Sequence, residues 1–159
     1  MFAFMAVKRM DHATLVVRDL DAAVAFFIEL GLSIEGRASV SGDAVERILG
    51  VPGVASDIAM MITPDGNSRV ELTRFSSPDV VEPSPWPTPP NVLGWANVMF
   101  EVDDIRDTVA RLETLGGTLV GEIVDYGGVY LLAYIRGPEG VVIALAQALS
   151  DAGAPLDAP

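Results

Sequence analysis

Short runs of apolar residues alternate with polar turns along most of the chain, which is the pattern of strands, and two longer apolar runs have helical spacing. The first helix is predicted over 21–30 (DAAVAFFIEL) and the second over 103–115. Gly31 follows the first, and Gly116 and Gly117 the second, where a left-handed residue would close each helix. A short helical turn is expected at 44–49. The predicted strands are 10–17, 32–40, 55–63, 68–75, 94–102, 118–126, 129–136 and 141–148.

A proline-rich segment divides these elements into two groups. Residues 76–90 contain six prolines, and proline removes a backbone donor and restricts φ, so this segment cannot be a central strand. We therefore predict one module over about 8–76, a linker over about 77–92 and a second module over about 93–149. Residues 150–159 are expected to form a flexible tail.

The two groups repeat one another. Residues 16–31 match 101–116 at an offset of 85 residues, so that Asp19 corresponds to Asp104 and Gly31 to Gly116. The turn Pro-Asp-Gly at 64–66 recurs as Pro-Glu-Gly at 138–140. The predicted fold class is α+β, with two tandem βαβββ modules that pair into an open, curved mixed β-sheet groove with the helices outside. This pairing is possible within one chain or by exchange between two chains.

Composition narrows the possible partners. The 22 acidic and 10 basic residues give a net charge of −12, which disfavours nucleic acid and anionic membranes because both are bound through clustered Lys and Arg. The chain has no cysteine, which excludes disulfides, thiolate metal sites and cysteine nucleophiles. No apolar run approaches the length of a membrane span, of about 20 residues. Lys8 and Arg9 follow the apolar start rather than precede it, so we expect a cytoplasmic protein.

Several short motifs resemble the vicinal oxygen chelate superfamily, which contains glyoxalase I, methylmalonyl-CoA epimerase, fosfomycin and bleomycin resistance proteins and extradiol dioxygenases. The motifs are MDH (10–12) before VVRDLDAAVAFF (16–27), RVEL (69–72), FEVDDI (100–105) and IRGPEG (135–140). The resemblance extends over about residues 8–148. The resemblance is specific for the fold but not for the reaction. The superfamily includes lyases, isomerases, dioxygenases, thiol transferases and sequestration proteins.

The resemblance also implies where a metal would bind. Metal-using members place one ligand on the first and one on the last strand of each half, which here correspond to His12 and Glu71, and to Asn97 and Ala144. The family often has His where this chain has Asn97 and Glu where it has Ala144. Two ligand-type residues therefore remain, with Asn97 as a weak third, and a divalent cation (Zn, Ni, Mn, Fe or Co) or no metal at all are both open.

His12 and Glu71 each allow more than one role. His12 is the only histidine and could be a hydrogen-bonded strand residue, a metal ligand or a proton carrier. Glu71 lies inside an apolar run, so its carboxylate should face a cavity or pair with a cation. It is our candidate general base, and an ion pair with Arg69 is the structural alternative.

Strand alternation predicts the lining of the groove. Side chains two residues apart on a strand share a face, so the neighbours of the four family positions should face the groove with them. For Trp95 and Met99, ordinary core filling is the alternative. The expected ligand-binding residues are Thr14, Arg69, Thr73, Trp95, Asn97, Met99 and Ala144.

These features support two main functions. The first is a small-molecule lyase or isomerase of glyoxalase or epimerase type, with an incomplete metal site. The alternative is a non-catalytic protein that binds or sequesters a small, antibiotic-like molecule, for which the negative charge would attract cations. A scaffold with a vestigial pocket is a third reading. We expect a small-molecule ligand and a homodimer.

Overall fold

The computed structural model describes residues 8–149, in two compact units divided between Val80 and Val81. The tail expected at 150–159 lies outside the described residues. In the described part of the chain, no helix is long and apolar enough to cross a membrane. The elements of unit 1 are β1 (Ala13–Val16), α1 (Leu20–Leu30), β2 (Ser33–Ser41), α2 (Asp43–Leu49), β3 (Ala55–Ile62) and β4 (Arg69–Ser77).

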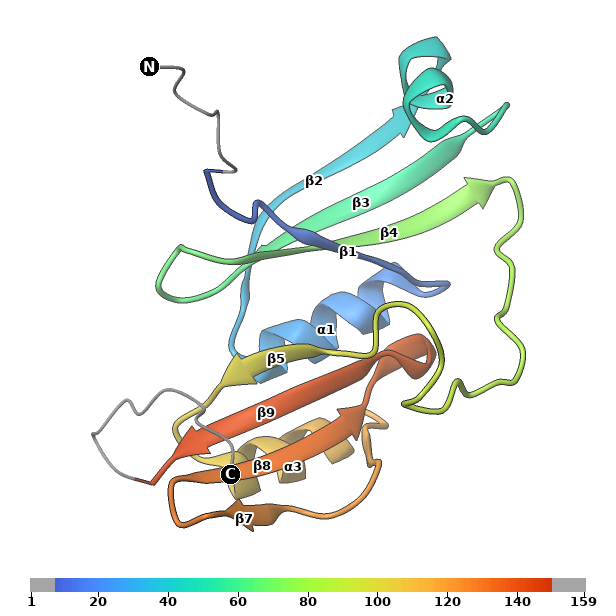
Figure 1. The fold of residues 1–159 in the computed structure, drawn as a ribbon. Coiled ribbons are helices and arrows are strands. Elements are labelled where there is room, and N and C mark those ends of the chain that lie inside the picture. Colours follow the sequence, from blue (N-terminus) through green and yellow to red (C-terminus); the bar gives the residue numbers. More distant parts are fainter. Residues whose placement is uncertain (1–7, 150–159) are drawn as a thin grey trace, which may run out of the picture. The chain divides into compact units, whose positions relative to one another are not determined.

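Unit 1 is a four-stranded mixed sheet with one helix on one face. The strand order is β1-β4-β3-β2, with β1 parallel to β4 and the other pairs antiparallel (Figure 1). Helix α1 contacts β2, β3 and β4. The strand residues under α1 are apolar and buried, for example Ala59, Met61 and Leu72. The other face of this sheet holds Thr14, Glu71 and Thr73, as strand alternation requires.

Helix α1 forms where the hydrophobic spacing predicted it. Asp19 is the N-cap, and its carboxylate accepts from the Ala22 backbone N–H at 2.9 Å. Phe26 and Phe27 are buried to 0% and 2% exposure, which anchors the helix to the sheet. Gly31 closes the helix with φ of 118°, a left-handed value that glycine adopts without steric cost.

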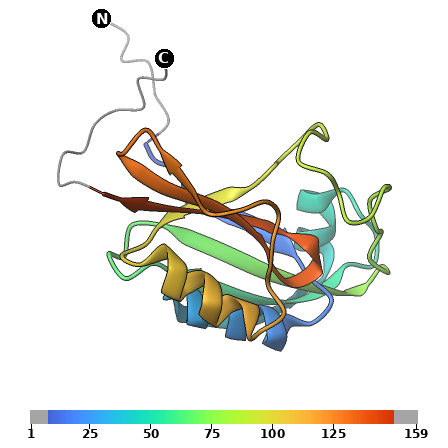
Figure 2. The same cartoon turned by 90° about the horizontal axis from the view of Figure 1, so that it is seen from below.

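Unit 2 repeats this topology. Its sheet order is β5-β9-β8-β6, with β7 also paired to β8 and with β5 parallel to β9. Helix α3 packs on β8 and β9, and Figure 2 shows its gold ribbon running along one face of these orange and red strands. The elements are β5 (Val98–Glu101), α3 (Ile105–Glu113), β6 (Thr118–Leu119), β7 (Val124–Tyr126), β8 (Tyr130–Arg136), a 3-10 turn (Pro138–Gly140) and β9 (Val142–Ala148).

The sequence repeat is therefore a structural repeat. Thr14 pairs with Glu71 in β1–β4, and Met99 pairs with Ala144 in β5–β9. Met99 lies 85 residues after Thr14 on the first strand of its unit, and Ala144 lies 73 residues after Glu71 on the last strand. The predicted α+β class with two βαβββ modules in open mixed sheets is confirmed, while the pairing of the modules stays a prediction.

Three strand predictions were too long. The strand expected at 10–17 is only β1, Ala13–Val16. The strand expected at 94–102 is only β5, because Gly94 has a positive φ of 119° and the partner strand β9 begins at Val142. Trp95 and Asn97 therefore precede the strand, as His12 precedes β1. The strand expected at 118–126 is divided into β6 and β7, with Gly121 between them, and glycine weakens a strand interior.

Candidate functional site

A polar cluster lies on the face of the unit 1 sheet opposite α1. The Thr14 hydroxyl donates to Glu71 Oε1 at 3.3 Å, and the Thr73 hydroxyl donates to the same oxygen at 2.9 Å. The Glu71 side chain is only 20% exposed. One carboxylate oxygen is thus held by two neutral donors, which leaves the charge of Glu71 available to a ligand or a proton.

His12 approaches the second oxygen of that carboxylate. Its Nε2 lies 4.0 Å from Glu71 Oε2, and its Nδ1 lies 2.9 Å from Asp11 Oδ2. Asp11 also accepts from Arg9 at 2.7 Å. The hydrogen bond to His12 lowers the pKa of the Asp11 carboxyl, which therefore stays ionised and acts as an acceptor. The contact with Asp11 at Nδ1 orients the ring so that Nε2 faces Glu71.

Arg69 shares this face but does not pair with Glu71. Its Nε and one terminal nitrogen donate to the two oxygens of Glu35 at 2.6 and 2.7 Å. The hydrogen bond lowers the pKa of Glu35 and raises that of Arg69. The alternative of an Arg69–Glu71 ion pair is therefore wrong. It fails because Glu35 sits in a β-bulge of β2 and reaches Arg69 across β3.

The corresponding positions of unit 2 are apolar. Met99, Ala144 and Ala146 occupy the places of Thr14, Glu71 and Thr73, and Ala144 is fully buried. Asn97, the weak third ligand expected from the resemblance, is half-buried before β5. Unit 2 thus retains the backbone positions of the site without its carboxylate.

Trp95 and Met99 do not fill a core. Their exposed fractions are 88% and 49%, so core filling, the alternative reading of these two residues, is wrong. The side-chain oxygen of Gln147 accepts from the Ile105 N–H at 2.9 Å and so faces α3 rather than Ala144.

The donor set does not fit a catalytic metal ion. Catalytic zinc sites use three protein ligands, and two ligands at tetrahedral angles lie about 3.4 Å apart for metal–ligand bonds of about 2.1 Å. His12 Nε2 and Glu71 Oε2 supply two donors at the wider spacing of 4.0 Å. Among the described residues, no group of three or more His, Cys, Asp or Glu side chains is placed to hold a metal. His12 and Glu71 therefore supply two of the three protein ligands that a catalytic metal ion needs.

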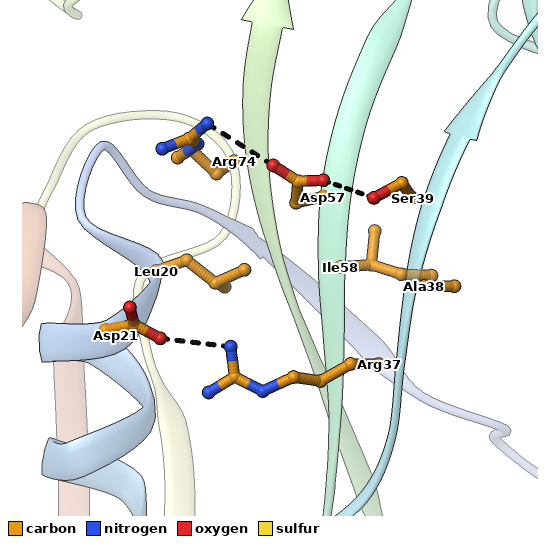
Figure 3. Close-up of a pocket in the computed structure, with 8 residues that line it drawn as sticks. All are labelled: Leu20, Asp21, Arg37, Ala38, Ser39, Asp57, Ile58 and Arg74. Carbon is orange, nitrogen blue, oxygen red and sulfur yellow. Dashed lines mark hydrogen bonds and ion pairs between the residues drawn. The ribbon is translucent and has the colours of Figure 1, made fainter.

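A separate shallow pocket of about 430 Å³ lies on the α1 side of the unit 1 sheet. Arg37 donates to Asp21 at 3.0 Å, while Asp57 accepts from Ser39 at 2.5 Å and from Arg74 at 3.3 Å (Figure 3). These two acidic and two basic groups neutralise each other. Sequence reasoning missed this pocket, because its charged side chains come from four separate elements. It does not include His12 or Glu71.

Comparison with known proteins agrees with the architecture. Residues 9–145 match the family model described as Glyoxalase/Bleomycin resistance protein/Dioxygenase superfamily. The chain belongs to this superfamily. No protein with a curated function is detectably similar to it in sequence.

Solved structures give the same assignment. A glyoxalase family protein from Bacillus cereus is 46% identical to this chain, with a TM-score of 0.88, and the match covers 94% of this chain and all of that one. The genomically encoded fosfomycin resistance protein FosX from Listeria monocytogenes is 15% identical, with a TM-score of 0.58 and coverage of 90% and 95%. A crystal structure of FosX with Mn(II) and sulfate is 14% identical, with a TM-score of 0.56 and coverage of 90% and 94%. At this identity the FosX match shows a shared fold only.

Proposed function

We propose that the polar face of unit 1 binds a small organic molecule and that Glu71 acts there as a general base, in a lyase or isomerase of glyoxalase or epimerase type. The observation that carries this proposal is the arrangement of the Glu71 carboxylate. Two hydroxyls bond one oxygen, at 3.3 and 2.9 Å, and the other oxygen faces His12. A base needs a fixed orientation and a free oxygen, and Glu71 has both.

His12 would carry the proton onward in this proposal. Its Nδ1 is held by Asp11 at 2.9 Å, so the ring is oriented with Nε2 toward Glu71. At 4.0 Å the two atoms are beyond hydrogen-bond distance, and a small closing movement or a bridging water would connect them. Such contacts often tighten only when the ligand is bound.

The proposal makes the reaction independent of a metal. A divalent cation would polarise a carbonyl oxygen if ligand oxygens completed its shell, but His12 and Glu71 provide only two donors. We expect treatment with a chelator to leave the activity of the protein unchanged.

Deuterium exchange tests this function. Wild-type protein is incubated in D₂O with a panel of α-keto and α-hydroxy carbonyl compounds, and loss of the α-proton is followed by NMR. Glu71→Gln should reduce exchange by about 100-fold or more, the usual contribution of a general base. Glu46→Gln on α2 removes the same charge from the surface of unit 1 and is the matched control. Unchanged exchange in Glu71→Gln would eliminate Glu71 as the base.

Non-catalytic binding is the second candidate, favoured by the apolar Met99, Ala144 and Ala146 in unit 2. It predicts no exchange with any compound of the panel, together with a raised Tm when a cationic aromatic compound binds. The net charge of −12 would attract such a ligand.

The homodimer and the cytoplasmic location belong to the same proposal. Sedimentation equilibrium of the purified protein at several concentrations tests the first, and fractionation of expressing cells tests the second. A mass of 16.8 kDa at all concentrations would show that the chain works as a monomer.

A further inference from the structure

One nitrogen of the Arg69 guanidinium is buried without a hydrogen-bond partner. In the described part of the chain, Nη1 has no acceptor, whereas Nε and Nη2 are bound by Glu35 at 2.6 and 2.7 Å. A buried charged donor without an acceptor is costly, and native structures leave few of them. This donor therefore calls for an acceptor that the described residues do not provide.

Glu35 fixes the direction of this donor. Arg69 is on β4 and Glu35 on β2, so the side chain of Arg69 crosses β3 to form its two-pronged ion pair. A guanidinium held by two parallel bonds is rigid, and its remaining N–H groups point in a set direction. The Arg69 side chain as a whole is 20% exposed, although Nη1 itself is buried.

Glu71 lies beside this donor on the same strand face. The two residues are two positions apart on β4, which places their Cα atoms roughly 7 Å apart. Because Arg69 is committed to Glu35, the Glu71 carboxylate is not neutralised by it. A carboxylate and a fixed cationic donor therefore lie on one strand face without cancelling each other.

The adjacent strand supplies an apolar surface. Ile58, Met60 and Ile62 of β3 are in register with Thr73, Glu71 and Arg69 and share their face, and all three are half-buried. A ligand over this face would meet a polar row on β4 and an apolar row on β3. Such a surface suits a molecule with one polar edge and an apolar body.

We infer that Arg69 Nη1 binds the carbonyl oxygen of the ligand, and that the ligand is a small carbonyl compound whose apolar part lies over Ile58, Met60 and Ile62. This inference rests on the proposed function of Glu71. Glu71 takes a proton from the carbon next to the carbonyl, and the electron pair of that C–H bond forms a carbon–carbon double bond. The carbonyl π electrons move to the oxygen, whose negative charge the Arg69 N–H stabilises. Return of the proton to carbon restores the carbonyl, so no oxidant or reductant is needed.

Binding of benzohydroxamate tests the inference without turnover. This compound is neutral near neutral pH, carries a carbonyl oxygen as acceptor and has an apolar ring. It also chelates metals, so the titration is done in excess EDTA and followed through the Arg Nε–H NMR signals. We expect the Arg69 signal to shift and Arg69→Met to weaken binding about 10-fold or more, as for loss of a charge-assisted hydrogen bond.

Two controls separate ligand binding from a structural role. Glu35→Gln removes the ion pair but keeps the Arg69 donor, and it should weaken binding much less than Arg69→Met. Arg74→Met removes an arginine of the same strand from the opposite face and should have no effect. If Arg69→Met destabilises the fold, Arg69→Lys is the second variant. It keeps the positive charge but lacks the several N–H donors of the guanidinium, so it should still weaken binding.

The outcomes distinguish this inference from the proposed function. Equal losses in Glu35→Gln and Arg69→Met would make Arg69 a structural residue and overturn the inference. Unchanged binding in Arg69→Met, with deuterium exchange still lost in Glu71→Gln, would overturn the inference alone. Exchange that survives Glu71→Gln would overturn the proposed function, whatever the role of Arg69.

Discussion

The two units have the same strand order, yet the positions that hold Thr14, Glu71 and Thr73 in unit 1 are apolar in unit 2. In unit 1, Thr14 and Glu71 face each other across β1 and β4, and in unit 2 Met99 and Ala144 do so across β5 and β9. The repeated backbone provides equivalent positions, and the side chains alone decide whether a position does chemistry.

Burial explains why the carboxylate occurs in only one unit. Glu71 is 20% exposed and bonded by two threonine hydroxyls, so its charge is partly solvated and partly satisfied. Ala144 is fully buried, and its neighbours Met99 and Ala146 offer no donor. A carboxylate there would gain no hydrogen bond from Met99 or Ala146.

A carboxylate at the equivalent position of unit 2, Ala144, should have the largest effect on stability. Ala144→Glu puts an unpaired charge and extra volume into a buried site, and we expect it to lower the free energy of unfolding by about 3 kcal/mol or more. The measurement is urea denaturation of the variant beside Glu71→Ala, which should cost much less. Equal losses at the two positions would show that the difference in burial is not the cause.

Removing the helix caps should have a smaller effect. Asp19 accepts from one backbone N–H at the start of α1, whereas Asp104 accepts from those of Arg106 and Asp107 at the start of α3, each at 3.0 Å. Replacement of either residue by Ala should lower the free energy of unfolding by about 1 kcal/mol. The loss should be slightly larger at Asp104, because two N–H groups lose their acceptor there. Thermal melts check this, with Asp103→Ala expected to stay within about 0.5 kcal/mol. An unchanged Tm in Asp104→Ala would contradict the role of Asp104 as a helix cap.

The smallest expected effect is on how far the Tm falls in acid, and it should come from an ion pair in unit 1. The hydrogen bond from Arg69 lowers the pKa of Glu35 below the ordinary value of 4.5. A depressed pKa stabilises the folded state above the ordinary value, and that contribution is lost as the pH falls through the folded-state pKa. Glu35→Gln should therefore have a lower Tm at neutral pH and a shallower fall in Tm below about pH 4.5.

Arg69→Met provides the matched control for this titration. It removes the cause of the shift, so it should flatten the acid profile as Glu35→Gln does, and the double variant should add nothing further. Profiles that stay parallel to the wild type would show that this ion pair does not contribute to acid sensitivity.

Local patterns predicted most of the fold. The spacing of apolar residues located α1 and α3, and Gly31 marked the end of α1 because capping depends on near neighbours. The repeat predicted the equivalence of Asp19 and Asp104, which are the N-caps of α1 and α3. The ends of β5 were not predictable in this way, because they depend on where the partner strand β9 begins.

The candidate site was predictable in part. Strand alternation placed Thr14, Glu71 and Thr73 on one face, and the structure brings them into hydrogen-bond contact. The partner of Arg69 was not predictable, because Glu35 reaches it across an intervening strand from a bulge. Pairing over such a distance depends on register, which has no local signal.

The amino-acid sequence by itself determined the repeat and the order of the elements, because periodicity and residue identity are local properties. Tertiary structure decided which side chains meet. In the folded chain Arg69 pairs with Glu35, and the Glu71 carboxylate faces two hydroxyls and His12. The physical reason is that a charged side chain pairs with the partner that the sheet register brings within reach, and register is set by the packing of the whole module.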